Sequence, residues 1–192
     1  MGGSGLAGLG RRDLSLGNIV SSNPHEAVAI RPWSEGDLPL LERTLGDPAM
    51  TVYLGGPETP EKLKERHQRF IRATGESEYV FVILVGSEAT PAGSVCCFDS
   101  EWEGVPIWEV GWSVLPEFQG RGIATAGTAL AIDRVRPLGR HRFMHAFPRV
   151  DNAASNAVCR KLGFEMCGEV DNEYPPGCPI RSINWRLDLL GG

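Results

Sequence analysis

The sequence predicts an α/β domain of the α+β kind, with one mixed central β-sheet and helices on both of its faces. Two observations predict this arrangement. In the first half of the chain, a short turn joins a strongly β-prone run to a second strand, which indicates an antiparallel pair. In the second half, strands and helices alternate, which indicates a parallel βαβ unit with a right-handed crossover. The length of 192 residues suits a single domain of ordinary size.

The first half is expected to open with a strand and two helices. Ser34 is suited to cap the first helix, and Glu35 and Asp37 follow in the turn where the helix dipole favours acidic groups. Pro39 falls early enough in this helix to be tolerated. The expected elements are a strand at 28–33, helices at 34–45 and 61–73, and antiparallel strands at 79–85 and 92–99.

Proline and glycine residues mark the ends of elements in the second half. Pro116 ends a strand, because proline cannot donate a hydrogen bond to the ladder. Pro137 and Gly139 end a helix, and Gly163 fits a left-handed cap at the end of another. The expected elements are strands at 107–114 and 142–147, helices at 123–136 and 153–162, and closing strands at 164–170 and 180–187.

Composition narrows the range of partners. The net charge of -5 argues against nucleic acid or an anionic membrane as the main partner, and leaves room for a cationic substrate such as an amine. The five cysteines show no CxxC pair or Cys/His spacing, so no metal site is predicted and the thiols are expected to be reduced. Neither a spanning apolar run nor a signal-peptide core is found, and a cytoplasmic protein is expected.

The chain divides into an extension and a folded domain. Residues 1–27 are expected to form a flexible N-terminal extension, and residues 28–190 the domain. Residues 3–8 match the dinucleotide pattern GxGxxG, but no strand precedes them, so they do not predict a nucleotide site.

The strand at 107–114 presents a candidate catalytic carboxylate. Period-two alternation places Glu109 on one face with Ile107, Gly111 and Ser113, where small neighbours leave open space beside it. The opposite face is expected to pack in the core and carries Trp108, Val110, Trp112 and Val114.

The turn after this strand has the features of an anion site. Two glycines and an alanine lead directly into a helix, where free N–H groups and the positive end of the dipole favour a pyrophosphate. A turn that merely starts a helix is the alternative, since such glycine patterns are common. Several small residues in the helix favour phosphate binding, because they let it pack close to the sheet. The turn consists of Gln119, Gly120, Arg121, Gly122, Ile123, Ala124 and Thr125.

A second polar group lies on the helix at 153–162. Asn152, Ser155, Asn156 and Cys159 follow helical spacing and form one continuous stripe. These side chains either contribute to a site or are solvated and serve the helix cap; the pattern alone leaves both interpretations open.

These motifs resemble those of a known superfamily. Gln119-x-x-Gly122-x-Ala124 resembles the acetyl-CoA-binding signature of the GNAT superfamily of N-acetyltransferases. Asn152-x-x-Ser155, followed by Lys-Leu-Gly-Phe at 161–164, resembles the later motif of that superfamily. The segment at 174–185 is similar to the RimJ/RimL-like branch, which includes the ribosomal-protein N-terminal acetyltransferases. The resemblance covers about residues 28–190 and implies a single-domain GNAT fold.

The resemblance implies acetyl-CoA as the acetyl donor and no metal. In the family, backbone groups of the central strand hold the pantetheine arm and the thioester carbonyl, which corresponds here to Trp112, Ser113 and Val114. The turn at 119–125 would hold the pyrophosphate, and Asn152 would contact the cofactor arm.

The resemblance also suggests catalytic roles. Glu109 matches a strand glutamate of the RimL-like branch and is the candidate base, directly or through water, although other branches place the carboxylate at the position of Trp108. Ser155 matches a serine proposed as the acid in the same branch. Cys159 replaces a tyrosine found in many members and is interpreted as a packing residue, while His145 is a third and weaker candidate for the acid.

The predicted activity is transfer of an acetyl group from acetyl-CoA to a primary amine, by direct attack in a ternary complex. The acceptor is a protein N-terminus or an amine-bearing small molecule, and a homodimer is left open. One alternative is a non-catalytic GNAT module that binds acetyl-CoA for sensing or structure, which the missing tyrosine favours. Another is a module that binds nucleotides lacking pantetheine.

Overall fold

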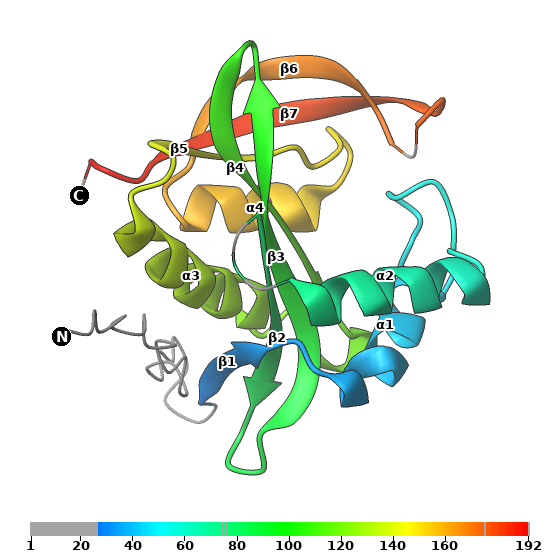
Figure 1. The fold of residues 1–192 in the computed structure, drawn as a ribbon. Coiled ribbons are helices and arrows are strands. Elements are labelled where there is room, and N and C mark those ends of the chain that lie inside the picture. Colours follow the sequence, from blue (N-terminus) through cyan, green and yellow to red (C-terminus); the bar gives the residue numbers. More distant parts are fainter. Residues whose placement is uncertain (1–26, 74, 76, 175, 192) are drawn as a thin grey trace, which may run out of the picture.

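The computed structural model describes residues 27–73, 75, 77–174 and 176–191. The extension expected at 1–27, with its GxGxxG match, therefore lies outside the described residues except for Ala27. The described chain forms a seven-stranded sheet in the order β1-β2-β3-β4-β5-β7-β6 (Figure 1). Its strands are β1 (Val28–Pro32), β2 (Glu78–Val85), β3 (Thr90–Trp102), β4 (Val105–Val114), β5 (Phe143–Ala146), β6 (Glu165–Glu173) and β7 (Pro179–Asp188). The α-helices are α1 (Leu38–Leu45), α2 (Pro60–Arg72), α3 (Ile123–Val135) and α4 (Ala153–Lys161).

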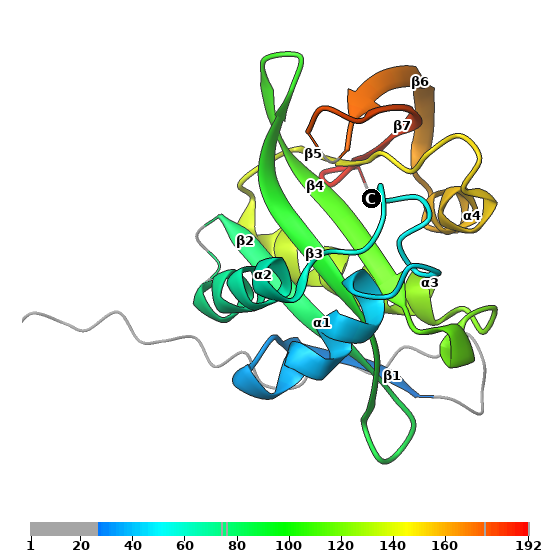
Figure 2. The same cartoon turned by 90° about the vertical axis from the view of Figure 1, so that its right-hand side faces the viewer.

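The predicted mixed sheet is confirmed. Strands β1 to β4 pair antiparallel in sequence order, β4 and β5 pair parallel across the α3 crossover, and β7 pairs antiparallel with both β5 and β6. Helices α1 and α2 lie together on one side of the sheet, away from α3 and α4 (Figure 1 and Figure 2). Both expected helix layers are therefore present.

Two apolar cores explain this layering, because alternate residues of β2 enter different cores. One core joins the sheet to α3 and α4, and the other joins it to α1 and α2. Phe81, Ile83 and Val85 belong to the first core, and Val80, Val82 and Leu84 to the second. Helix α3 lies close to β2, since a Cβ on Gly127 would stand 2.6 Å from Cδ1 of Ile83. The small residues of this helix thus serve the close packing that the sequence suggested.

The hairpin of β3 and β4 is longer than predicted. The sequence places strand ends at Asp99 and Ile107, whereas the ladder continues to the pair Trp102 and Val105. The connecting Glu103 and Gly104 both have positive φ, which makes a tight turn. The added residues mix polar and apolar side chains without a regular alternation, so the pattern could not reveal them. Cross-strand hydrogen bonding extends the strands regardless.

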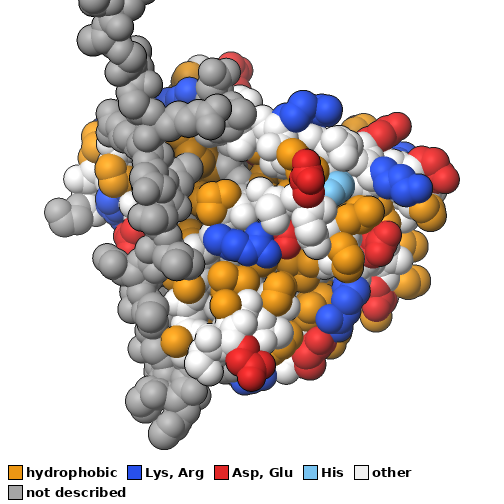
Figure 3. Space-filling model, turned by 60° about the horizontal axis from the view of Figure 1, so that its bottom comes forward, with side chains coloured by type: hydrophobic (Ala, Val, Ile, Leu, Met, Phe, Trp, Pro, Cys, Tyr) orange, Lys and Arg blue, Asp and Glu red, His pale blue; other side chains and the backbone are white. Residues whose placement is uncertain are grey.

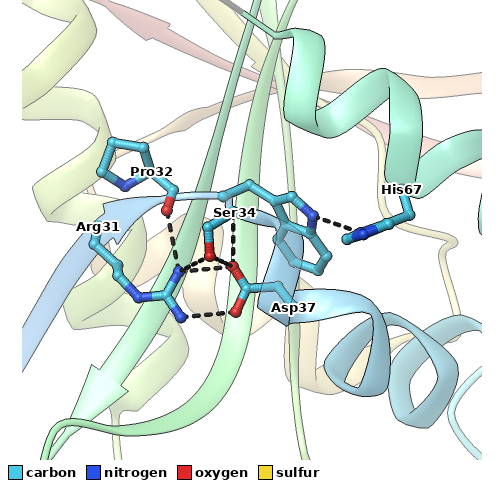
Figure 4. Close-up of polar contacts among 6 residues, drawn as sticks. Arg31, Pro32, Ser34, Asp37 and His67 are labelled. Atoms are coloured by element: carbon cyan, nitrogen blue, oxygen red, sulfur yellow. Dashed lines mark hydrogen bonds and ion pairs between the residues drawn. The ribbon is translucent and has the colours of Figure 1, made fainter.

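The helix predicted at 34–45 is divided in two. A short 3₁₀ turn at Glu35–Asp37 precedes α1, and Ser34 and Asp37 form a capping box. Asp37 accepts hydrogen bonds from two guanidinium nitrogens of Arg31, at 2.6 and 2.7 Å. Figure 4 shows this ion pair beside the buried bond from Trp33 Nε1 to His67 Nδ1, which is 3.1 Å long. These bonds fix β1 against α1 and α2.

The surface carries charges of both signs. On the face shown in Figure 3, acidic and basic side chains are interspersed among apolar ones. None of the described helices is both long enough and apolar enough to cross a membrane.

Candidate active site

The parallel pair of β4 and β5 opens directly after Glu109. The two strands are paired only at Trp108 with Met144 and at Glu109 with His145, although β4 continues to Val114. Beyond this point the freed length of β4 borders a cavity of about 930 Å³, together with the first turn of α3 and one side of α4. The separation of the strands therefore creates this cavity, and it leaves backbone groups of β4 available to a ligand.

The turn at 119–125 brings the start of α3 to this cavity. Gln119 Nε2 donates to the carbonyl oxygen of Val114 at 2.9 Å, which fastens the turn to the end of β4. Gly120 and Gly122 have φ of 73° and 80°, a region that favours glycine. A Cβ on Gly120 would meet nothing within 4 Å, and no side chain of the described residues caps the helix. The first N–H groups of this 13-residue helix are thus open to an anion such as a pyrophosphate.

Helix α4 supplies the opposite wall. Asn152 caps it, since its side-chain oxygen accepts from the backbone N–H of Ser155 at 3.1 Å, and its amide nitrogen donates to no described residue. Both residues line the cavity. Asn156 is buried and braces the wall: it donates to the carbonyls of Arg149 and Asn152 and accepts from Trp185 Nε1 at 2.8 Å. The polar stripe predicted on this helix is thus divided between a cavity wall and a structural network.

Glu109 is held half-buried on β4, on the face that the sequence predicts. Burial raises the pKa of its carboxyl group, and the hydrogen bond that it accepts from Ser100 Oγ, at 3.2 Å, opposes the rise. A raised carboxyl pKa brings the group closer to the range in which a general base works well near neutral pH.

A smaller cavity of about 500 Å³ lies on the side of Glu109 that faces α2. It shares four lining residues with the larger cavity, namely Phe98, Ser100, Glu109 and Tyr174. Glu109 therefore stands where the two cavities meet, and a molecule in either one can reach its carboxylate.

The structure brings the predicted site residues together, with one exception. The guanidinium of Arg121 points away: it stacks over the Phe118 ring at 5.5 Å and donates to the carbonyl of Glu117 at 3.2 Å. The residues that line the larger cavity are Glu109, Trp112, Ser113, Val114, Gln119, Gly120, Gly122, Ile123, Ala124, Thr125, Asn152 and Ser155.

The two weaker candidates for the acid are buried structural residues. Cys159 is fully buried in the core, and burial raises the pKa of its thiol to about 12. His145 Nδ1 lies 2.7 Å from Asn184 Oδ1, and burial lowers the pKa of its imidazole. Neither residue lines the two cavities. The interpretation of Cys159 as a packing residue agrees with this position.

Sequence reasoning missed two residues that shape the site, Ser100 and Glu78, and it missed the structural role of a third, Asn156. Ser100 fell outside because the predicted strand stopped at Asp99. Asn156 was placed in the polar stripe, but its contact with Trp185 depends on the tertiary fold. Glu78, which lines the smaller cavity, precedes the predicted strand by one residue and had no pattern to mark it. Among the residues that the structure describes, no group of three His, Cys, Asp or Glu side chains is placed to hold a metal ion.

The geometry on the described residues is therefore a split sheet and an open helix start beside a half-buried carboxylate, all bordering one cavity. A family profile described as "Acetyltransferase (GNAT) domain" matches residues 28–165. The chain therefore belongs to the GNAT acetyltransferase family, as the motifs indicated, and is by family an acetyl-CoA-dependent N-acetyltransferase.

Solved structures share this fold. The acetyltransferase from Salmonella typhimurium that modifies the N-terminal serine of ribosomal protein L7/L12 is 21% identical, with a TM-score of 0.70 over 84% of this chain and 94% of that one. RimJ from Mycobacterium smegmatis, in complex with a CoA disulfide, is 19% identical, with a TM-score of 0.70 over 90% of this chain and 87% of that one. Spermidine N-acetyltransferase from Vibrio cholerae, in complex with CoA and spermine, is 18% identical, with a TM-score of 0.70 over 85% and 96%.

At these identities the likeness shows the fold, and the predicted resemblance to the RimJ/RimL-like branch is confirmed at that level. None of the curated proteins with which the chain was compared matches it significantly in sequence.

Proposed function

We propose that this chain transfers an acetyl group from acetyl-CoA directly to a primary amine, within a ternary complex, with Glu109 as the base and Ser155 as the acid. The observation that carries the proposal is the position of Glu109 at the junction of two cavities, one suited to the donor and the other open to an acceptor. Direct attack needs both substrates at one point, and the junction offers that point.

The residues along the larger cavity fit the donor. N–H groups at the start of α3 would bind the pyrophosphate, and the freed length of β4 from Trp112 to Val114 would pair with the pantetheine amides. Asn152 would contact the arm through its amide nitrogen. The bound donor supplies an acetyl group activated as a thioester.

Proton movements follow from the chemistry of the amine. An aliphatic ammonium must lose a proton before nitrogen can attack, and Glu109 would accept it and pass it to solvent. Attack forms the C–N bond and breaks the C–S bond. Ser155 would protonate the departing sulfur and regain a proton from the nitrogen, which becomes an amide. One proton is released in total.

The acceptor class is a protein N-terminus or an amine-bearing small molecule. Two of the similar structures support this breadth, since one enzyme modifies an N-terminal serine and the other is a spermidine acetyltransferase. We also propose that residues 28–190 form the catalytic domain, that it acts in the cytoplasm, and that it needs neither a metal nor a nucleic-acid partner.

The test is a panel of amines and N-terminal peptides with acetyl-CoA, read as release of free thiol. Thiol release that depends on the amine would support the proposal. Binding of acetyl-CoA without turnover across the panel would instead favour the alternative, a non-catalytic module. Binding of adenine nucleotides equal to that of acetyl-CoA would argue against the role given to β4.

A further inference from the structure

The smaller cavity contains a second carboxylate, Glu78, in the same row of the sheet as Glu109. Glu78 of β2 is paired with Phe98 of β3, and Phe98 is paired with Glu109 of β4. Directly paired residues share a face, so both carboxylates project to the α2 side, two strands apart. Strands lie about 4.8 Å apart, which places the two backbone positions about 10 Å from each other.

Glu78 lacks the hydrogen bonds that a nearly buried carboxylate normally has. Its side chain is 12% exposed, and its nearest charged neighbour is Arg69, whose Nε lies 3.4 Å from Oε2. Oε1 is buried and has no hydrogen-bond partner among the described residues. Burial raises the pKa of this carboxyl group, although the charges of Arg69 and Arg66 oppose the rise. Buried polar atoms are normally satisfied, so an unsatisfied one beside an open cavity indicates a missing partner.

The other charged groups of this cavity already have partners. Arg66 donates to Glu58 through Nε, at 3.0 Å, and through a second guanidinium nitrogen. Asp99 pairs with Arg140 at 3.3 Å and with His141. The charges left to face an acceptor are those of Arg69, Glu78 and Glu109, with a sum of one negative charge.

A single protonated amine balances this charge. A second ammonium would leave an excess of positive charge, and a carboxylate would leave an excess of negative charge. An uncharged N–H or O–H group can donate a hydrogen bond to Glu78 without changing the net charge of the cavity.

We propose that Glu78 is a specificity-determining residue, which accepts a hydrogen bond from an uncharged N–H or O–H group of the acceptor while the amine of the same molecule faces Glu109. This inference rests on the proposed function and deepens it. The acceptor class is a primary amine with a neutral donor a few atoms away, such as an amino-acid amide or the first residues of a peptide. Simple alkylamines lack this uncharged hydrogen-bond donor, and diamines carry a second ammonium group in its place.

Matched acceptors separate this hydrogen bond from the basicity of the amine. Glycinamide and β-alaninamide carry amide N–H donors at two distances from the amine, and their N,N-dimethyl amides lack those donors. 1,3-Diaminopropane offers a charged donor instead. Each acceptor is assayed with the wild type, with Glu78→Gln, which keeps the shape of the side chain, and with Glu65→Gln. Glu65 is exposed on α2 and lines neither cavity, so this variant controls for the loss of one negative charge.

We expect Glu78→Gln to lower kcat/KM for the primary amides by about tenfold, because the glutamine oxygen can accept the hydrogen bond only as a neutral group and the contribution of the negative charge is lost. The N,N-dimethyl amides should change by less than about threefold, because they offer Glu78 no amide N–H group. The drop should lie mainly in KM, because the bond forms on binding and persists during the reaction. Glu65→Gln should behave as the wild type with every acceptor.

Two results would overturn the inference while leaving the proposed function intact. One is an equal effect of Glu78→Gln on the primary and the dimethylated amides. The other is a larger effect on 1,3-diaminopropane, which would make Glu78 a site for a second ammonium. Absence of turnover with every acceptor would contradict the proposed function. In that case, binding is measured instead, as the rise in melting temperature that each amide causes in the presence of CoA. The inference then requires that Glu78→Gln reduce this rise for the primary amides and not for the dimethylated amides.

Discussion

Replacement of Glu109 by glutamine tests the proposed base directly. Glutamine has nearly the same size as glutamate, and its side-chain oxygen can still accept the hydrogen bond from Ser100 Oγ. The change therefore removes the proton-accepting group and leaves the packing of β4 in place. The rate should fall by roughly a hundredfold, which corresponds to about 2.7 kcal/mol of activation free energy.

The pH dependence of the variant sharpens this prediction. An alkylamine with a pKa of about 10 is neutral in about one molecule in a thousand at pH 7, and this fraction grows about tenfold per pH unit until the pKa is reached. The activity of Glu109→Gln should rise with pH as free amine accumulates. An α-amine, with a pKa of about 8, should need less rescue at pH 7.

Stability supplies an independent control. The folded-state pKa of Glu109 lies above the usual carboxyl value because of burial. The native state therefore holds the proton more tightly than the unfolded state, and ionisation of Glu109 costs stability as pH rises through the folded pKa. Glu109→Gln removes that cost, so the variant should melt at the wild-type temperature or above it near neutral pH.

The assay follows thiol release from acetyl-CoA at saturating amine between pH 6 and pH 10, values chosen to span the range of roughly neutral to basic amines. Glu88→Gln, in the exposed turn between β2 and β3, is the matched control. A Glu109→Gln protein that keeps the wild-type kcat across this range would refute the role of Glu109. Ser155 and backbone groups would then act on an amine that is already neutral in the site.

Other positions give further tests. Gly122→Asp should abolish the rise in melting temperature caused by acetyl-CoA, because it places a like charge and a side chain where the pyrophosphate binds; unchanged affinity in a folded variant would contradict this position for the site. Cys159→Ala should keep most of the activity and lose about 1 kcal/mol of stability through a small cavity; an acetyl-thioester trapped on Cys159 would show the opposite. Asp37→Asn should cost about 2 to 3 kcal/mol near neutral pH. Burial opposes ionisation of Asp37, but hydrogen bonds from Arg31 and Ser34 outweigh it and lower the pKa of the carboxyl group. The loss of unfolding free energy, measured by chemical denaturation, should therefore shrink at acid pH, where the wild-type carboxyl group becomes protonated.

The sequence predicts the geometry of the proposed donor site well, because local chemistry determines it. The turn at 119–125 needs glycine for positive φ, and the alternation of the strand at 107–114 fixes which face carries Glu109. Residue identity alone therefore indicates the conformation of the turn and the face of the strand.

The proposed acceptor side of the site depends on pairing between distant strands. Glu78 and Ser100 come to Glu109 only through the register of β2, β3 and β4, and no local pattern encodes that register. The side chain of Arg121 shows a related limit. The place of Arg121 in the turn was predictable. The stacking of its guanidinium on Phe118 depends on the position of the short 3₁₀ helix at 116–118.

The short pairing of β4 with β5 divides the sheet into two leaves, one formed by β1 to β4 and the other by β5, β7 and β6. Only two residue pairs of the ladder join the leaves. If the donor binds as proposed, in the gap between these two leaves, it would supply hydrogen bonds that the sheet lacks there, so binding and local stability would be linked. In the free protein, amide protons of the C-terminal leaf should therefore exchange with solvent faster than those of the N-terminal leaf. A ligand bound in this gap should slow hydrogen exchange in the residues that border it on either side.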